Sequence, residues 1–186
     1  MDVLAISGSL RSNSYNTALL NSAMELAPPN MNISLFNYVG KMPHFNPDLQ
    51  ENSIHSSVLK FREAIAKSDA LLISTPEYAH GVPGALKNAL DWVVSSSEII
   101  LKPIAIMSVS TSELGGFRAT APLIQVLHAM NTSVIIDATL NIPFAKTKFD
   151  ESGALVDSAT RQALENTLST IANTVEQRMI GNTQRV

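Results

Sequence analysis

Apolar residues along the chain form short unbroken or alternating runs, separated by longer stretches in which they recur at helical spacing. The short runs predict strands, and the stretches with apolar residues three or four positions apart predict amphipathic helices. The five predicted strands cover residues 3–7, 31–36, 69–75, 103–109 and 131–136. The helical stripes lie within residues 19–27, 54–65, 83–93, 123–130 and 164–175. Residues 37–50 and 144–157 are predicted to be mostly loop.

Regular alternation of strands and helices indicates an α/β protein with a parallel sheet that is covered on both faces. Because crossover connections are right-handed, few topologies remain. The candidate is a flavodoxin-like three-layer α/β/α sandwich, with a five-stranded parallel sheet in the order 2-1-3-4-5. We expect one domain over residues 1–180 and a frayed tail over residues 181–186.

Composition narrows the function classes. The 186 residues contain no cysteine, which excludes disulfides, thiolate catalysis and cysteine-based metal sites. A net charge of −3 gives no electrostatic argument for binding nucleic acid, and no run of basic residues suggests a membrane surface. The sequence shows no signal peptide and no span of about 18 apolar residues, so a cytoplasmic protein is expected.

The loop after the first predicted strand is rich in hydroxyl groups and carries one cation. Ser9, Arg11, Ser14 and Asn16 lie where that strand leads into a helix. The first turn of a helix has free N–H groups and partial positive charge, so it favours an anion. The same residues also suit an ordinary strand–helix turn, because Ser and Asn cap helices. Neither G-x-G-x-x-G nor a P-loop motif is present, so one terminal phosphate, as in a mononucleotide, is the natural ligand.

The loop after the third strand combines proline, glycine and three side chains able to carry protons. Its backbone could follow the edge of a heteroaromatic ring, with Tyr78 packed beside that ring. Glu77 is interpreted as a carboxylate that holds loop geometry rather than as a proton donor. His80 either lines the mouth of the pocket or is a solvated residue, and no second histidine stands at metal-ligand spacing from it.

The loop after the fourth strand contains Ser110, the pair Gly115-Gly116 and the cation Arg118. Paired glycines allow a backbone to approach a flat ligand, or they serve a tight turn before the helix. Arg118 is a candidate partner for a second phosphate or for a carboxylate of another subunit. In the helix predicted over residues 83–93, which follows the loop after the third strand, Lys87 and Asp91 have the i,i+4 spacing of a surface ion pair, and Trp92 is interpreted as packing.

With these residues in view, the chain resembles the NADPH-dependent FMN reductase family of flavodoxin-like proteins. The likeness rests on Gly8-Ser9-Leu10-Arg11 with Ser14 and Asn16, and on Pro76-Glu77-Tyr78 followed by residues 83–92. Residues 115–116 and 149–153 fit the same pattern. The family often has Asn after its Pro-Glu-Tyr triplet, whereas this chain has Ala79, which removes any contact made by that side chain.

The resemblance implies FMN as cofactor and NADPH or NADH as co-substrate. It places the FMN phosphate at Ser9, Arg11, Ser14, Tyr15 and Asn16. It places the flavin ring at Pro76, Glu77, Tyr78 and Ala79, with Ser110 and Gly115 approaching from the third loop. No residue needs to act as a nucleophile, because the flavin carries the chemistry. Tyr78 and His80 are the candidates for positioning or proton supply.

The resulting hypothesis is an FMN-dependent NAD(P)H oxidoreductase that reduces a quinone, free flavin or similar small acceptor. Family members commonly form homodimers or homotetramers, which the resemblance implies here as well. Two alternatives remain at this level: a flavodoxin-type electron carrier, and an FMN-binding redox-responsive interaction protein. The low net charge and the cation in the phosphate loop argue against the carrier, whose docking face is usually strongly acidic.

Overall fold

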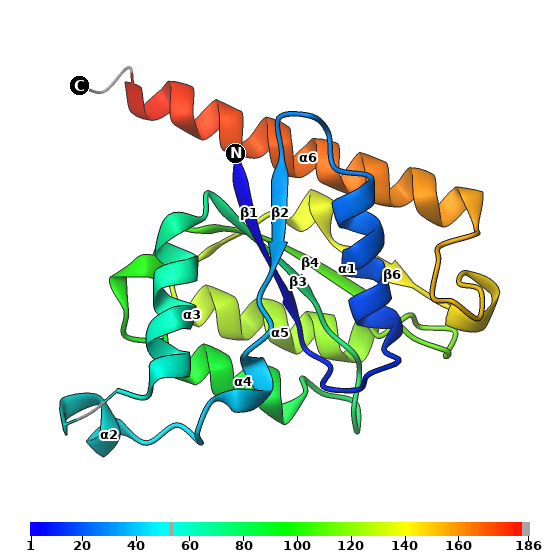
Figure 1. The fold of residues 1–186 in the computed structure, drawn as a ribbon. Coiled ribbons are helices and arrows are strands. Elements are labelled where there is room, and N and C mark those ends of the chain that lie inside the picture. Colours follow the sequence, from blue (N-terminus) through cyan, green and yellow to red (C-terminus); the bar gives the residue numbers. More distant parts are fainter. Residues whose placement is uncertain (53, 184–186) are drawn as a thin grey trace.

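The computed structural model describes residues 1–52 and 54–183. Its sheet has the order β2-β1-β3-β4-β5, all pairs being parallel, and β6 also pairs with β4 (Figure 1). The strands are β1 (Asp2–Ser7), β2 (Asn32–Leu35), β3 (Ala70–Ser74), β4 (Pro103–Val109), β5 (Ser133–Val134) and β6 (Leu140–Ile142). The predicted strand order and flavodoxin-like fold are confirmed.

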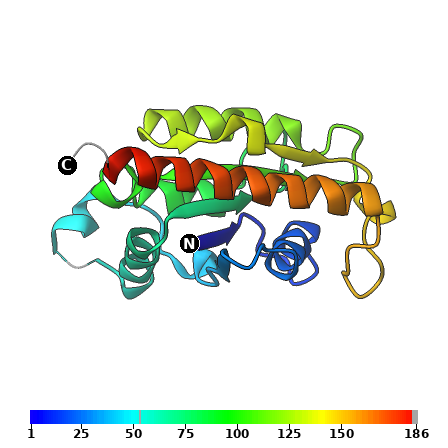
Figure 2. The same ribbon diagram turned by 90° about the horizontal axis from the view of Figure 1, so that it is seen from above.

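Helices cover both faces of this sheet. They are α1 (Tyr15–Glu25), α2 (Pro47–Asn52), α3 (Ser56–Lys67), α4 (Gly84–Asp91), α5 (Phe117–Ala129) and α6 (Ser158–Thr183). Short 3-10 turns occur at η1 (Val39–Lys41), η2 (Ser97–Ile99), η3 (Ile136–Ala138) and η4 (Ala145–Thr147). Seen from above, α6 extends across most of the width of the molecule (Figure 2). In the described part of the chain, no helix combines the length and apolar character needed to cross a bilayer.

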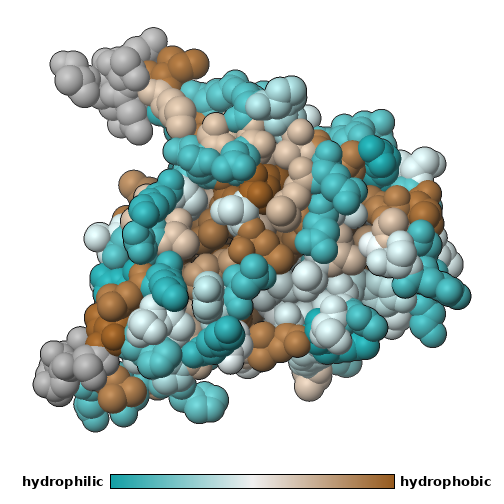
Figure 3. Space-filling model, in the orientation of Figure 1, coloured by the Kyte–Doolittle hydropathy of each residue, from teal (hydrophilic) through white to brown (hydrophobic). Residues whose placement is uncertain are grey.

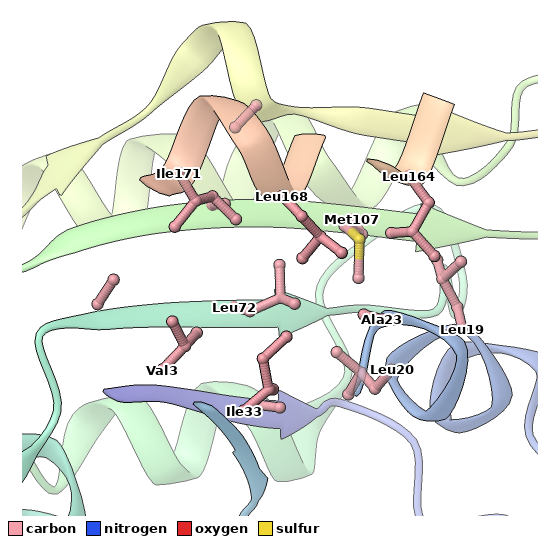
Figure 4. Packing of buried hydrophobic residues seen from close by; sticks show 14 of the residues in the cluster. Val3, Leu19, Leu20, Ala23, Ile33, Leu72, Met107, Leu164, Leu168 and Ile171 are labelled. Carbon is pink, nitrogen blue, oxygen red and sulfur yellow. The ribbon is translucent and has the colours of Figure 1, made fainter. Parts of the chain in front are cut away.

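The alternating side chains of the central strands feed two separate cores. On one face, Val3, Leu72 and Met107 pack under Leu20 of α1 and Leu168 of α6 (Figure 4). On the other face, the intervening strand residues pack against α3, α4 and α5. Since successive strand residues point to opposite faces, an unbroken apolar run is what a sheet covered on both sides requires.

The fifth predicted strand is much shorter than expected. Asn131 has a φ of 54°, and Thr132 N–H donates to the Leu127 carbonyl at 3.2 Å, so both residues still belong to the end of α5. The strand β5 then contains two residues, the chain turns through η3, and it returns to β4 as β6. The fifth strand and its place beside β4 are therefore confirmed, but its predicted bounds of 131–136 were wrong.

Two further segments differ from the prediction. Residues 37–50 were predicted as loop but contain η1 and the start of α2, whose first residue is Pro47. Asn46 Oδ1 accepts from Asp48 N–H at 3.0 Å, so an asparagine followed by proline begins this helix. At the other end, α6 continues through residue 183, where a frayed tail was expected from 181. Residues 184–186 lie outside the described residues.

Candidate functional site

Three loops meet at the carboxyl ends of β1, β3 and β4. The chain leaves β1 at the lower edge of the molecule and enters α1, beside the loops that follow the other two strands (Figure 1). Strand order reverses between β1 and β3, which is where open α/β sheets place their ligands. The loops are residues 8–14, 75–83 and 110–116.

Gly8 lets the first loop pass very close to the second. Its N–H donates to the Ser74 carbonyl at 2.8 Å, which extends the β1–β3 ladder by one bond. A Cβ at this position would lie 3.1 Å from Leu86 Cδ2 and 3.2 Å from Pro76 Cδ. This packing brings the start of the anion loop against the proline that opens the second loop.

Ser14 caps α1, and the helix N-terminus faces an open pocket. Its Oγ accepts from Thr17 N–H at 3.5 Å. The pocket has a volume of about 440 Å³ and holds Arg11 beside the first turn of the helix. It is lined by Arg11, Ser12, Asn13, Ser14, Tyr15, Thr17, Ala18, Asn21 and residues 150–153. A guanidinium, hydroxyl groups and a helix N-terminus in one pocket make the donor set that a phosphate requires.

The far wall of this pocket is a hydrogen-bonded turn that follows η4. Asp150 Oδ1 accepts from Ser152 Oγ at 2.7 Å, from Ser152 N–H at 2.9 Å and from Ala154 N–H at 3.0 Å. These hydrogen bonds, the Ser152 hydroxyl first, hold the pKa of Asp150 below its usual range. Tyr15 packs on Phe149 with ring centroids 5.6 Å apart, which joins this wall to α1.

Ser9 links the first and second loops. Its Oγ accepts from Arg11 N–H at 3.3 Å and lies 3.4 Å from the Tyr78 hydroxyl. Ser9 is buried, whereas 47% of Tyr78 is exposed at the rim. The structure therefore brings together the predicted phosphate residues Ser9, Arg11, Ser14 and Tyr15 and sets Tyr78 beside them.

Asn16 is the exception among the predicted phosphate residues. Only 3% of it is exposed, and its side chain bonds to Ser74 and Val109 at the ends of β3 and β4. The amide therefore faces the sheet and not the pocket, which corrects the expectation for that side chain. Its backbone N–H belongs to the first turn of α1.

The second loop makes a tight turn with unusual backbone angles. Tyr78 and Gly81 exchange two backbone hydrogen bonds, at 3.3 and 3.0 Å. Between them, Ala79 has a φ of 48° and His80 a φ of 60°. Positive φ at both central positions is the pattern of a type I′ turn, for which Gly and Asn are the preferred residues. The backbone conformation at Ala79 is therefore sufficient reason for asparagine to be preferred at this position, whether or not its side chain contacts a ligand.

Glu77 fixes the third loop to the second. Its Oε2 accepts from the backbone N–H of Arg118, in the first turn of α5, at 3.2 Å. A carboxylate at a helix N-terminus is favourable, so the interpretation of Glu77 as a geometry-holding residue is supported. The Arg118 guanidinium lies 3.1 Å from His80 Nε2, an intramolecular contact that neither of the two predictions for Arg118 included.

The two glycines of the third loop serve packing. A Cβ on Gly115 would lie 2.8 Å from the backbone of Ile142, and one on Gly116 would lie 1.9 Å from Ser108 Oγ. Both have positive φ, at 58° and 87°. Of the two uses predicted for this pair, the tight turn before α5 is the one the structure shows. Ser110 follows β4 directly and is half-buried, and its Oγ is 3.1 Å from Ser112 Oγ.

The helix after the second loop matches its prediction. Lys87 Nζ and Asp91 Oδ1 form an ion pair at 2.6 Å, and Trp92 is buried. The Trp92 indole N–H donates to the Pro43 carbonyl at 2.8 Å. Asn88 also bonds to this segment, through Pro43 O and Phe45 N–H.

Sequence reasoning missed the hydroxyl groups that connect the strand ends. Ser7 Oγ lies 2.8 Å from Thr17 Oγ1, and Ser108 Oγ donates to Thr75 O at 2.6 Å. The available signal was that each central apolar strand ends at or near a serine. Among the residues that the structure describes, no three His, Asp or Glu side chains converge as a metal ion would require.

Comparison with known proteins assigns the family. The profile of the NADPH-dependent FMN reductases matches residues 1–147. The chain belongs to this family. It is 39% identical over 171 residues to an NAD(P)H-dependent FMN reductase of Pseudomonas aeruginosa, covering 91% of this chain and 92% of that protein. An NADPH:quinone oxidoreductase of Arabidopsis thaliana is 36% identical over 176 residues, covering 89% of this chain and 87% of that protein.

A solved structure agrees with this assignment. The flavoenzyme NAD(P)H:(acceptor) oxidoreductase FerB of Paracoccus denitrificans superposes with a TM-score of 0.86 at 29% identity, covering 95% of this chain and 97% of that one. The site at the carboxyl ends of β1, β3 and β4 is thus part of an FMN reductase fold. The enzyme class expected from the sequence is confirmed, and the two alternatives are not favoured.

Proposed function

We propose that this protein binds FMN across the three loops and uses it to pass reducing equivalents from NADPH or NADH to a small acceptor. The donor set at the start of α1 carries this proposal, because a capped helix N-terminus, hydroxyl groups and Arg11 share one pocket. In the described residues, no carboxylate lies within 4.0 Å of the Arg11 guanidinium, so its charge is available to a phosphate.

Each loop has its own part in this arrangement. Ser9, Arg11, Ser14 and Tyr15 hold the phosphate, and Asn16 contributes only its backbone N–H. The ring is bordered by Pro76, Glu77, Tyr78, Ala79, Ser110 and Gly115. Glu77 acts by joining the second and third loops, and Gly115 acts through the close packing of its backbone.

When bound, FMN supplies hydride acceptance from the nicotinamide and electron delivery to a second substrate. The residues around the ring position both substrates and exclude water. Tyr78 and His80 stand at the rim, where they can orient a substrate or supply a proton.

The acceptor is a small planar molecule such as a quinone or free flavin. Exposed apolar side chains occur on the second loop, on the third loop and at the start of α5, where Tyr78, Leu114 and Phe117 are 47%, 42% and 55% exposed. A planar apolar molecule gains from contact with such groups. On the face seen in Figure 3, hydrophobic and hydrophilic residues are intermixed. The names of the relatives from Pseudomonas and Arabidopsis support the same substrate class.

The proposal also covers the assembly and the setting of the protein. Residues 1–180 form one FMN-binding domain, the protein works as a homodimer or homotetramer, and it acts in the cytoplasm. The resemblance to the family supports the oligomer.

Two measurements test the proposal. The purified protein should show a flavin spectrum, release FMN on denaturation, and oxidise NADPH when FMN and a quinone are supplied. Arg11→Ala should weaken FMN binding by about 10- to 100-fold, because a charge-assisted contact to phosphate contributes about 1.5–3 kcal/mol. Binding of riboflavin, which lacks the phosphate, should stay unchanged.

Arg161→Ala provides a matched control, since Arg161 lies on α6 and pairs with Glu165 at 3.4 Å. Wild-type protein that binds FMN yet gives no NADPH turnover would refute the enzyme. Equal FMN affinity in Arg11→Ala and Arg161→Ala would show that the phosphate lies elsewhere.

A further inference from the structure

The ladder between β3 and β4 ends at the site, and Asn16 stands at its end. The two strands pair from Leu71 and Ile104 to Ser74 and Met107. Thr75 N–H then donates to the Met107 carbonyl at 2.9 Å, which is the last backbone bond on this side. The next residue, Pro76, has no N–H and leads the chain away. The N–H and carbonyl of Val109 are thereby left without a strand partner on the β3 side.

The Asn16 amide makes the two hydrogen bonds to Val109 that a longer β3 would otherwise make. Its Nδ2 donates to Val109 O at 3.0 Å, and its Oδ1 accepts from Val109 N–H at 3.1 Å. The same Oδ1 accepts from Ser74 Oγ at 2.9 Å, and Ser74 is fully buried. One side chain of α1 is thus bonded to the last residues of two strands.

These hydrogen bonds connect the two halves of the site: the anion pocket at the start of α1 is one half, and the loops at residues 75–83 and 110–116 are the other. The residue belongs to the first turn of α1, where the anion pocket lies, and its partners immediately precede the loops at residues 75–83 and 110–116. We infer that Asn16 is a positioning residue, which fixes the separation between the phosphate-binding helix end and the loops that border the flavin ring. This inference rests on the proposed function.

The role follows from what a mononucleotide must do. FMN contacts both halves at once, so the second contact is intramolecular once the first has formed. The strength of this second contact then depends on how well the two halves are held at the distance that FMN spans. A looser connection should weaken a ligand that reaches both halves, but not a ligand that reaches only one.

A direct phosphate contact is the competing role, and the geometry opposes it. Both acceptor positions of Oδ1 are occupied, Nδ2 holds the Val109 carbonyl, and 97% of the residue is covered. The side chain would have to break these buried bonds in order to reach the pocket, which leaves the Val109 backbone groups unpaired.

Three probes separate the roles in Asn16→Ala: FMN, riboflavin and inorganic phosphate as a competitor. Asn173→Ala is the control, because Asn173 is exposed on α6. We expect Asn16→Ala to bind FMN about tenfold more weakly, while riboflavin and phosphate change by less than about twofold. The rate at which NADPH reduces the FMN-saturated variant should fall as well.

Other patterns overturn the inference. Parallel weakening of FMN and phosphate would make Asn16 a direct ligand, and parallel weakening of FMN and riboflavin would indicate a general loss of structure. Unchanged FMN affinity would also refute it. If Asn16→Ala does not fold, Ser74→Ala replaces it as the test, because it removes one of the three hydrogen bonds of the Asn16 side chain. We expect Ser74→Ala to bind FMN about threefold more weakly, again with riboflavin and phosphate binding unaffected. Failure of wild-type protein to bind FMN would instead refute the proposed function.

Discussion

Gly116 offers the sharpest stability test, because a single methyl group there meets a buried hydroxyl. It precedes α5 with a φ of 87°, and a Cβ would lie 1.9 Å from Ser108 Oγ and 2.9 Å from Ser108 Cβ. Ser108 is fully buried, and its Oγ donates to Thr75 O at 2.6 Å. Gly116→Ala must therefore displace this hydroxyl and strain the backbone.

Two effects contribute to the loss in free energy of unfolding caused by Gly116→Ala. The left-handed conformation costs an alanine about 1–2 kcal/mol relative to glycine. Displacing the Ser108 hydroxyl leaves Thr75 O without its donor, which costs about 1–3 kcal/mol for a buried group. We expect Gly116→Ala to lower the free energy of unfolding by about 2–5 kcal/mol. This is a large fraction of the roughly 5–15 kcal/mol of a natural domain.

Urea unfolding of the FMN-free protein measures this loss. With a slope of about 2 kcal/mol per molar urea, the midpoint should fall by about 1–2.5 M. Gly84→Ala is the control, because Gly84 begins α4 without positive φ and a Cβ there has nothing within 4 Å. That control should be neutral or slightly stabilising.

A double-mutant cycle identifies the cause. In a Ser108→Ala background the Oγ is absent, so Gly116→Ala should lose about 1–3 kcal/mol less than in the wild type. An equal loss in both backgrounds would refute the clash with the hydroxyl. A loss below about 1 kcal/mol in the wild-type background would refute the whole estimate.

Two further predictions concern the second loop and α6. Ala79→Asn should raise the free energy of unfolding of the FMN-free protein by about 0.5–1 kcal/mol, because asparagine tolerates a φ of 48° better than alanine. Its thermal midpoint should therefore rise, and a lowered midpoint would contradict this. The Thr160 hydroxyl and N–H, and then Lys148, hold the pKa of Asp157 below its usual range. Its stabilising contribution should be complete above the unfolded pKa of about 3.9 and disappear as the pH falls through the lower folded value. Asp157→Asn should flatten this acid dependence in urea titrations, and an unchanged slope would contradict the assignment.

Much of the fold followed from local patterns. An unbroken run such as residues 103–109 identifies a strand covered on both faces, and right-handed crossovers then leave few strand orders, among which 2-1-3-4-5 is a common one. The short β5 was not predictable in the same way. Whether residues 131 and 132 end α5 or begin a strand depends on the hydrogen bond of Thr132 to Leu127, and the apolar pattern is compatible with both.

The residues of the site also differ in whether they were predictable from local sequence. Arg11 and Ser14 were recognisable because a cation and a cap at a strand–helix turn act locally. Asn16 has the same neighbours in sequence, yet its partners Ser74 and Val109 are 58 and 93 positions away. Only the assembled sheet determines which way that amide faces, so neither spacing nor family resemblance indicated its direction.

The polar residues of the site therefore form two groups with different consequences for substitution. Asn16, Glu77 and Ser108 bond to backbone groups of other segments and hold the three loops at fixed separations. Arg11 and Tyr78 face outward, where a ligand reaches them. Replacing an outward residue should affect the one ligand group that it contacts, as Arg11→Ala should affect phosphate. Replacing an inward residue should affect ligands according to how many loops they touch, so FMN should be more sensitive than riboflavin. Comparing these two ligands across both groups distinguishes contact from geometry without reference to turnover.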